Sequence, residues 1–274
     1  MRIAVLITCF NRKDKTVKCL ENLQRIFDGS NHQIDIHLTD DGCTDGTAEA
    51  VLEIYPNATI YKGGNLFWAG GMRLAWKGAI SKGIYDYYLL LNDDTYVNEY
   101  LLKDFEEAHK YGQGKSLIVG NTCDPVTKEP TYVAVKCISK IPFKCQSAAP
   151  NGSPQQASFA GANIWFVPKC IVDEIGVFPN IYVHGVADND YCWRVLKHGF
   201  NVLSSSHYCG YCEADHCAKS KKVLQQMTIR ERWKHMFSPK GQEFKQQLYF
   251  QWCFFPWRFP FALGKGLLRI LFGI

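Results

Sequence analysis

Tyr87-Tyr88-Leu89-Leu90-Leu91-Asn92-Asp93-Asp94-Thr95 is the stretch that decides the fold. Its five apolar or aromatic residues do not alternate with polar ones, a pattern typical of a central strand covered on both faces in a parallel α/β sheet. Asn and Asp oxygens follow at the carboxyl end, where ligands bind in such sheets. The stretch therefore predicts a buried strand ending at a site suited to Mg²⁺ or Mn²⁺. An ordinary polar turn is the alternative.

Strands and helices alternate around this stretch, which predicts βαβ units and a mostly parallel sheet flanked by helices. Strands are expected at residues 3–8, 34–38, 58–61, 87–91, 117–119, 158–167 and 200–203. Residues 124–156 are rich in Pro, Ser, Lys and Asn with weak periodicity, and we expect an irregular excursion there. The fold class is therefore α/β.

The C-terminus differs in composition from the rest of this 274-residue chain. Residues 244–274 contain four basic side chains, no acidic one, and many aromatic residues. We expect one domain over residues 1–240 and a helical, amphipathic tail over 241–274 that lies on an anionic membrane surface. The uncharged run 246–257 is too short to span a bilayer. A helix packed on the domain, or at the interface of a homodimer, is the alternative.

The overall composition and the N-terminal sequence exclude several other classes of protein. The net charge of +5 is concentrated in the tail, so the body does not have the basic surface of a nucleic-acid-binding protein. The apolar run at residues 3–7 is too short for a signal peptide, and the twelve cysteines are expected to be reduced thiols. These features predict a cytoplasmic protein, peripheral on the inner face of the cell membrane.

Two motifs suggest other ligands and are weaker. Gly112-Gln113-Gly114-Lys115-Ser116 lacks the first glycine of a phosphate loop and follows a predicted helix instead of a strand. Cys209 and Cys212, with His207, His216 and Cys217 nearby, could hold structural zinc, but a second, distant Cys/His pair is missing, so an ordinary polar loop is favoured.

Three acidic clusters remain after this elimination. Asp40-Asp41 follows the second predicted strand, Asn92-Asp93-Asp94 the fourth, and Asp188-Asn189-Asp190 opens a predicted helix. Each cluster alone is an ordinary turn or helix cap. Because strand ends meet at one edge of a parallel sheet, we expect the three clusters to converge on one cleft.

These motifs together resemble a family 2 glycosyltransferase, a GT-A-type nucleotide-sugar transferase similar to the rhamnosyltransferase-like enzymes that build bacterial surface polysaccharides. Ile7 to Arg12 resembles the family's first strand and loop, and Asp40 to Gly46 resembles its D-D-G-S-x-D-G. Asn92-Asp93-Asp94 occupies the D-x-D position, and Ala187 to Asp190 the position of E-D-x-D. Three residues depart from the pattern: Cys43 replaces a Ser, Asn92 replaces an Asp, and Ala187 replaces a Glu.

The resemblance implies a role for each matching residue. The implied catalytic base is Asp188, and the implied metal ligands are Asp94, Asn92 and His207. The acceptor side would include Gly161, Trp165 and Asp190. The implied donor-binding residues are Thr8, Asn11, Arg12, Asp40, Asp41, Gly64, Asn65, Trp68, Gly70, Gly71, Asn92 and Asp93.

The implied reaction is transfer of a hexosyl or deoxyhexosyl group from a nucleotide-diphosphate donor to a saccharide or lipid-linked saccharide, with inversion and with a divalent cation, Mg²⁺ or Mn²⁺, as cofactor. Two other functions stay open. A non-catalytic nucleotide- or sugar-binding protein at a membrane surface is suggested by Asn92 and Ala187. A sugar nucleotidylyltransferase should carry a glycine-rich, basic signature after the first strand, which Cys9 to Arg12 does not supply.

Overall fold

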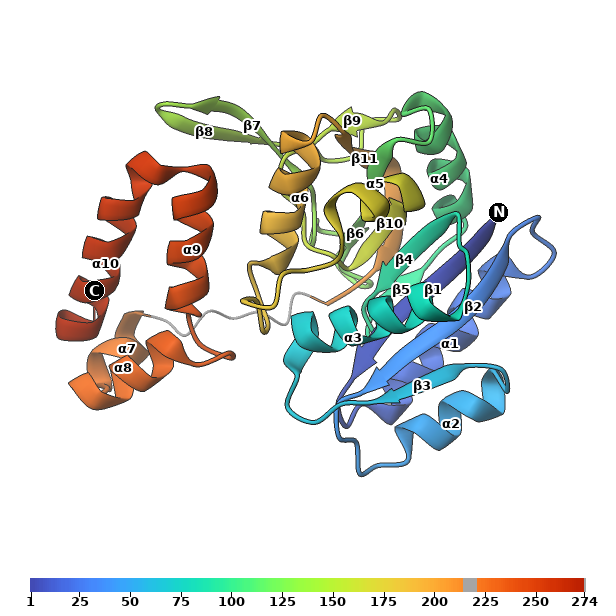
Figure 1. The fold of residues 1–274 in the computed structure, drawn as a ribbon, viewed down its shortest axis with the longest axis horizontal. Helices are drawn as coiled ribbons and strands as arrows, with labels where there is room; N and C mark the ends of the chain where they lie inside the picture. The colour runs from blue at the N-terminus through green and yellow to red at the C-terminus, as the bar shows by residue number, and fades with distance from the viewer. Residues whose placement is uncertain (214–220, 274) are drawn as a thin grey trace.

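The computed structural model describes residues 1–213 and 221–273, and its core is one large mixed sheet (Figure 1). The sheet order is β3-β2-β1-β4-β10-β6-β11-β5, with β9 paired to β11. The strands are β1 (Arg2–Cys9), β2 (Gln33–Asp40), β3 (Thr59–Lys62), β4 (Tyr87–Leu91), β5 (Tyr96–Val97), β6 (Ser116–Cys123), β9 (Gln155–Gln156), β10 (Ile164–Pro168) and β11 (Asn201–Tyr211). A separate hairpin joins β7 (Val135–Lys140) and β8 (Phe143–Ser147).

Helices flank this sheet and form a separate group at the C-terminus. The helices of the sheet region are α1 (Lys13–Phe27), α2 (Thr47–Ile54), α3 (Phe67–Lys82), α4 (Tyr100–Tyr111), α5 (Lys169–Ile175) and α6 (Ala187–Lys197). Those of the C-terminal group are α7 (Lys221–Gln226), α8 (Ile229–Phe237), α9 (Phe244–Phe254) and α10 (Phe259–Phe272), with a 3₁₀ turn at Pro256–Arg258. Figure 1 shows this group at one side of the molecule, next to α6.

The predicted α/β class is confirmed, and β4 has the central place that its apolar run predicts. All five of its residues are buried, and it lies between β1, which is parallel to it, and β10, which is antiparallel. Alternate residues of the strands pack on opposite faces of the sheet: Leu90 joins the cluster that contains Trp76 of α3, and Leu89 joins the cluster of Leu20 and Phe105 from α1 and α4. The chain leaves β1, β2 and β4 at the same edge, since these three strands are parallel.

Residues 124–156 are more regular than the sequence indicates. They contain the hairpin β7–β8, whose strand β7 alternates half-buried and exposed residues, so that one face packs and the other is open to water. The short length of these strands and the intervening Pro142 hide that alternation in a composition-based analysis. The last strand, β11, is also longer than expected and continues to Tyr211.

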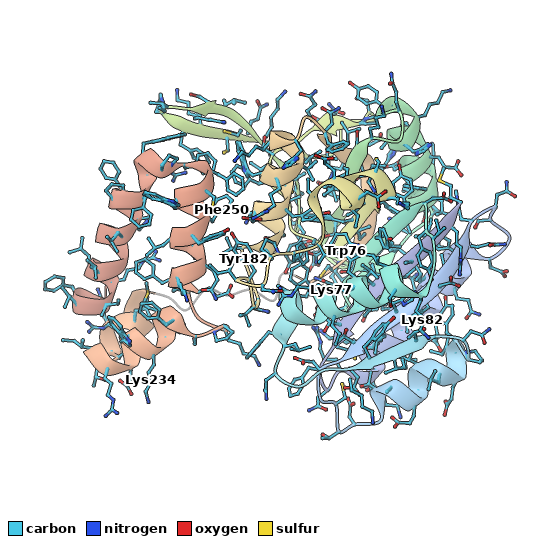
Figure 2. All side chains as sticks on the ribbon, viewed as in Figure 1. Trp76, Lys77, Lys82, Tyr182, Lys234 and Phe250 are labelled. Carbon is cyan, nitrogen blue, oxygen red and sulfur yellow. The ribbon has the colours of Figure 1, made fainter. Side chains whose placement is uncertain are left out.

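The C-terminal helices pack on the body of the protein and on each other. Phe250 and Phe255 bury their rings against Trp193 of α6, and Figure 2 shows Phe250 on α9, between the group and the body. Met236 of α8 and Ile270 of α10 share a second cluster. The boundary expected at residues 240/241 therefore falls between helices that pack together. Among the described residues, no helix has the length and apolarity needed to cross a membrane.

Candidate active site

A cavity of about 770 Å³ lies at the edge of the sheet where β1, β2 and β4 end. All three acidic stretches reach it, through Asp41, through Asn92-Asp93-Asp94 and through Asp188. Its remaining lining residues are Thr8, Cys9, Phe10, Arg12, Asn65, Phe67, Trp68, Tyr132, Gly161, Ala162, Asn163, His184, Gly185, Ser238, Pro239 and Lys240. The clusters thus share one cavity, which is large enough for a nucleotide-sized ligand.

Asp41 organises the glycine-containing loop before α3. Its Oδ1 accepts hydrogen bonds from the backbone N–H groups of Gly64 and Leu66, both at 2.8 Å, and its Oδ2 accepts one from Phe67 at 2.9 Å. A Cβ on Gly63 would lie 2.7 Å from Asp41 Oδ1, so the close approach of this loop requires glycine there. Asp41 therefore fixes the wall that Asn65 and Phe67 contribute.

The next part of the wall holds opposite charges in contact. The Arg12 guanidinium pairs with Asp93 at 3.1 Å and with Asp94 at 2.5 Å. Burial, with the neighbouring Asp94 carboxylate, raises the pKa of Asp93 to about 7, although Arg12 acts in the opposite direction. The Trp68 indole N–H donates to Asn92 Oδ1 at 2.8 Å. The end of β4 therefore presents a set of oxygen atoms held in place by a cation and an indole.

The third acidic stretch reaches the cavity through Asp188, which lies in the first turn of α6. The backbone N–H groups of Asn189 and Ala162 donate to its carboxylate, the former at 2.7 Å, which connects α6 with the segment leading into β10. Burial raises the pKa of Asp188 to about 6, against the effect of these N–H groups. At neutral pH the group is mostly ionised and still a competent proton acceptor, as a general base requires.

The sequence profile of glycosyl transferase family 2 matches residues 4–144, just over half of the chain. The chain belongs to this family. No curated protein matches it in sequence.

The chain also resembles solved structures of TarS from S. aureus. One, of TarS residues 1–349, aligns with 13% identity and a TM-score of 0.56 over 82% of this chain and 64% of that one. The complex of the same fragment with UDP-GlcNAc aligns with 12% identity and a TM-score of 0.57 over 98% and 82%. Against a longer TarS structure, the match spans 43% of that chain. At such identities the likeness extends to the fold, which is GT-A-like as expected.

Ten of the expected site residues line the cavity. They are Thr8, Arg12, Asp41, Asn65, Trp68, Asn92, Asp93, Asp94, Gly161 and Asp188. The glycines expected to bind the donor support the wall instead of lining it. A Cβ on Gly71 would lie 2.1 Å from Thr8 Oγ1, so glycine lets α3 pack closely on β1. Gly64 donates to Asp41, and Gly70 donates to the carbonyl of Val183.

Asp40 and Asn11, also expected at the donor, lie outside the lining and shape neighbouring loops. Asp40 Oδ1 accepts from the N–H groups of Gly42 and Cys43 at 3.0 and 2.6 Å, which makes the turn after β2. Asn11 Oδ1 accepts from the Thr44 N–H at 2.7 Å and ties the loop after β1 to that turn. Asp40 Oδ1 and Asn11 Oδ1 are therefore both engaged by groups of the loop that follows β2.

Two residues expected on the acceptor side are buried away from the cavity. The Trp165 side chain is fully buried in the core, where it packs near Tyr191. Asp190 is also fully buried, accepts from the Tyr182 hydroxyl at 2.8 Å and pairs with Arg194 at 2.5 Å. Asp188 and Asp190 are two positions apart on one helix, so their side chains point in nearly opposite directions, and only Asp188 lines the cavity.

His207 does not join the oxygen cluster after β4. Its Nδ1 pairs with Asp104 at 2.9 Å, and its ring stacks on Tyr100 with centroids 4.4 Å apart. The register of β11 against β6 shifts between Ser204 and Tyr208, and in this irregular stretch the His207 side chain faces α4. Cys209 also faces Asp104, while His216 and Cys217 of the possible zinc site lie outside the described residues.

The carboxylate and amide oxygens at the end of β4 fit a divalent cation in one particular way. Mg²⁺ in nucleotide enzymes is commonly held by one or two carboxylates together with substrate phosphates. Asp93 and Asp94 already converge on one positive group, the Arg12 guanidinium, which marks the place where a cation is attracted. Within residues 1–213 and 221–273, no group of three His, Cys, Asp or Glu could hold a metal alone. The residues therefore suit a cation shared with a phosphorylated ligand.

The wall formed by the C-terminal helices was not expected from the sequence. Ser238, Pro239 and Lys240, between α8 and α9, line the cavity, and Lys240 Nζ lies 6.0 Å from the ring centroid of Phe10. The predicted domain limit leaves these residues at the very end of the domain and separates them from the tail at 241–274. No local pattern in a Ser-Pro-Lys turn distinguishes a cavity wall from a surface loop, so the sequence offered no signal for it.

Proposed function

We propose that this protein is an inverting glycosyltransferase that moves a sugar from a nucleoside diphosphate to a hydroxyl group of a saccharide or lipid-linked saccharide. The observation that carries the proposal is the meeting of Asp41, Asp94 and Asp188 in one cavity. The family supports sugar transfer, and the TarS complexes with UDP and with UDP-GlcNAc support a nucleotide sugar as the donor.

Each wall of the cavity has a task in this reaction. Asp41 and the loop that it holds face the nucleoside, and Arg12 supplies positive charge to the diphosphate. A divalent cation, held by Asp94 with Asp93 and Asn92, would offset the negative charge that develops on the departing diphosphate. The oxygen of the acceptor hydroxyl bonds to the anomeric carbon while the bond from that carbon to the diphosphate breaks. Asp188 takes the proton that the hydroxyl loses in this step. A single displacement of this kind inverts the configuration at that carbon.

The test is a thermal-stability screen of the full chain against a panel of nucleotide sugars, with and without Mn²⁺, followed by turnover of each stabilising donor with candidate acceptors. We expect one class of donor to stabilise the chain, more strongly with Mn²⁺, and to be consumed. Donor binding without turnover on any acceptor would favour the non-catalytic binder. Formation of a nucleotide sugar and pyrophosphate from a nucleoside triphosphate and a sugar phosphate would favour the nucleotidylyltransferase.

We further propose that the protein works at an anionic membrane, on the cytoplasmic face. Helix α8 exposes Ile229, Trp233 and Phe237 at intervals of four residues, and α10, which packs beside it, exposes Phe261 and other large apolar side chains. Figure 2 shows Lys234 on the outer side of α8. Apolar side chains mixed with basic ones suit a helix lying in an anionic bilayer surface. A lipid-linked acceptor would explain that location.

Flotation with vesicles tests the membrane proposal. The full chain is expected to float with phosphatidylglycerol vesicles and much less with phosphatidylcholine, and a Trp233→Ser, Phe261→Ser double variant should lose most of that binding. Ile84→Ser, which changes an exposed residue between α3 and β4, is the matched control. Truncation at residue 244 would be less informative, because it removes Phe250 and Phe255 from the packing on Trp193. Dimerisation without vesicle binding would assign the apolar surface to a second copy of the chain.

A further inference from the structure

A buried carboxyl group from the C-terminal helices reaches the wall of the cavity. Glu243, immediately before α9, accepts hydrogen bonds from the backbone N–H of His184 at 3.0 Å and of Gly185 at 2.5 Å, one on each oxygen. Its side chain belongs to the buried set, although most glutamates are exposed. Both His184 and Gly185 line the cavity. Glu243 thus contacts the wall from behind and does not line the cavity itself.

His184 and Gly185 lie between two points at which backbone hydrogen bonds fix the chain. On the N-terminal side, the Ala69 and Gly70 N–H groups of α3 donate to the Val183 carbonyl at 3.0 and 3.2 Å. On the C-terminal side, the Asp190 N–H donates to the Val186 carbonyl at 3.0 Å as α6 begins. Glu243 holds the segment between these points. Asp188 follows only three residues after Gly185, so this segment sets how α6 enters the cavity.

The Glu243 contact is costly to maintain, which argues that it has a purpose. Its backbone has φ +43°, in the left-handed region that residues with a side chain rarely adopt. Burial, together with the Asp188 charge, raises the pKa of Glu243 to about 7, although the backbone N–H groups of Gly185 and His184 stabilise the ionised form and act in the opposite direction. Strained backbone and a desolvated charge persist where the surrounding structure needs them, commonly at functional sites.

We propose that Glu243 is a positioning residue for the transfer reaction, which fixes the His184–Gly185 wall and, through it, the orientation of the helix that carries Asp188. The C-terminal helices are then a working part of the active site and more than a membrane-associating tail. The effect on catalysis rests on the proposed function. The contact of Glu243 with His184 and Gly185 rests on the hydrogen bonds alone.

The first test compares Glu243→Gln with the parent, using the full chain. Glutamine has nearly the same shape, but its NH₂ group cannot accept from a backbone N–H, so one of the two bonds is lost. We expect kcat to fall about ten-fold or more, while KM for the donor stays within about two-fold, because Asp41 and Asp94 lie on other elements. Glu231→Gln is the matched control, since Glu231 also accepts a backbone N–H at a helix start but does not line the cavity or contact its wall residues His184 and Gly185.

A second variant reaches the same contact from the other partner. A Cβ on Gly185 would lie 2.7 Å from Glu243 Oε2, so Gly185→Ala should displace the carboxylate. We expect Gly185→Ala to lower kcat as Glu243→Gln does, and the double variant to lose little more than the worse single variant, since both changes remove one interaction. Additive losses, a parent-like kcat for Glu243→Gln, or equal losses of kcat and donor affinity would overturn the proposal.

Amide hydrogen exchange separates this inference from the proposed function. Exchange at His184 and Gly185 should be faster in Glu243→Gln than in the parent, and unchanged in Glu231→Gln. If the parent turned over no nucleotide sugar while exchange responded in this way, the proposed function would fail and the contact would stand. If exchange at these two amides did not change, Glu243 would not position the segment.

Discussion

Asp188 is the residue whose replacement should most sharply separate chemistry from binding. Its carboxylate lines the cavity, and burial raises its pKa to about 6. A group with that pKa is about 90% ionised at pH 7 and about 9% ionised at pH 5, so kcat/KM of the parent should fall about ten-fold between these values. Asp188→Asn keeps an oxygen for the backbone N–H groups but cannot take a proton. We expect its rate to fall by about 10² to 10⁴ and its remaining activity not to follow that titration.

The assay for this prediction is acceptor-dependent release of the nucleoside diphosphate across pH 5–8, with donor affinity measured by calorimetry on the same samples. Donor affinity of Asp188→Asn should match the parent within about two-fold, because the donor-side residues are unchanged. Its stability at neutral pH should not be lower, because the raised pKa means that the ionised form is unfavourable in the folded state. An Asp188→Asn rate within a few-fold of the parent would refute the assignment of the base.

Two further substitutions distinguish the neighbouring carboxylates. Asp94→Ala should leave the fold intact but abolish turnover and the extra stabilisation that Mn²⁺ adds to donor binding. A chelator should abolish both in the parent. Full activity in either experiment would contradict the assignment of Asp94 as a metal ligand. Asp190→Asn should lower the free energy of unfolding by about 3 kcal/mol in urea titrations, because it leaves Arg194 without its buried partner, with a smaller effect on kcat per folded molecule than Asp188→Asn. A dead but fully stable Asp190→Asn would move the base to Asp190.

Local pattern was enough to predict the scaffold and the acidic residues that line the cavity at the strand ends. The apolar run before Asn92 specified a doubly covered strand, and strand ends carrying Asp41 and Asp94 had to meet, because β1, β2 and β4 run parallel. The direction of a side chain after the strand end was less accessible. Asp40 and Asp41 are adjacent, yet one turns into its own loop and the other holds the next loop, and only the tertiary contacts decide which.

Long-range contacts explain the parts that the sequence did not reveal. Trp165 resembles an acceptor-side residue, but its place on the central strand β10 buries it. Glu243 lies just beyond the expected domain limit, where composition indicated only a basic aromatic tail, and Lys240 is the last residue before that limit. Their roles depend on α9 packing against Trp193, a contact between residues more than fifty positions apart in the chain. Patterns of period 2 or 3.6 carry no information about such contacts.

The anomeric configuration of the product tests the central claim most directly. With a donor identified in the stability screen and its acceptor, proton NMR of the reaction mixture at early times reports whether the new glycosidic bond has the configuration opposite to that of the donor. A single displacement with Asp188 as the base predicts inversion. A product that retained the donor's configuration would contradict the account, because retention cannot arise from one displacement in this cavity.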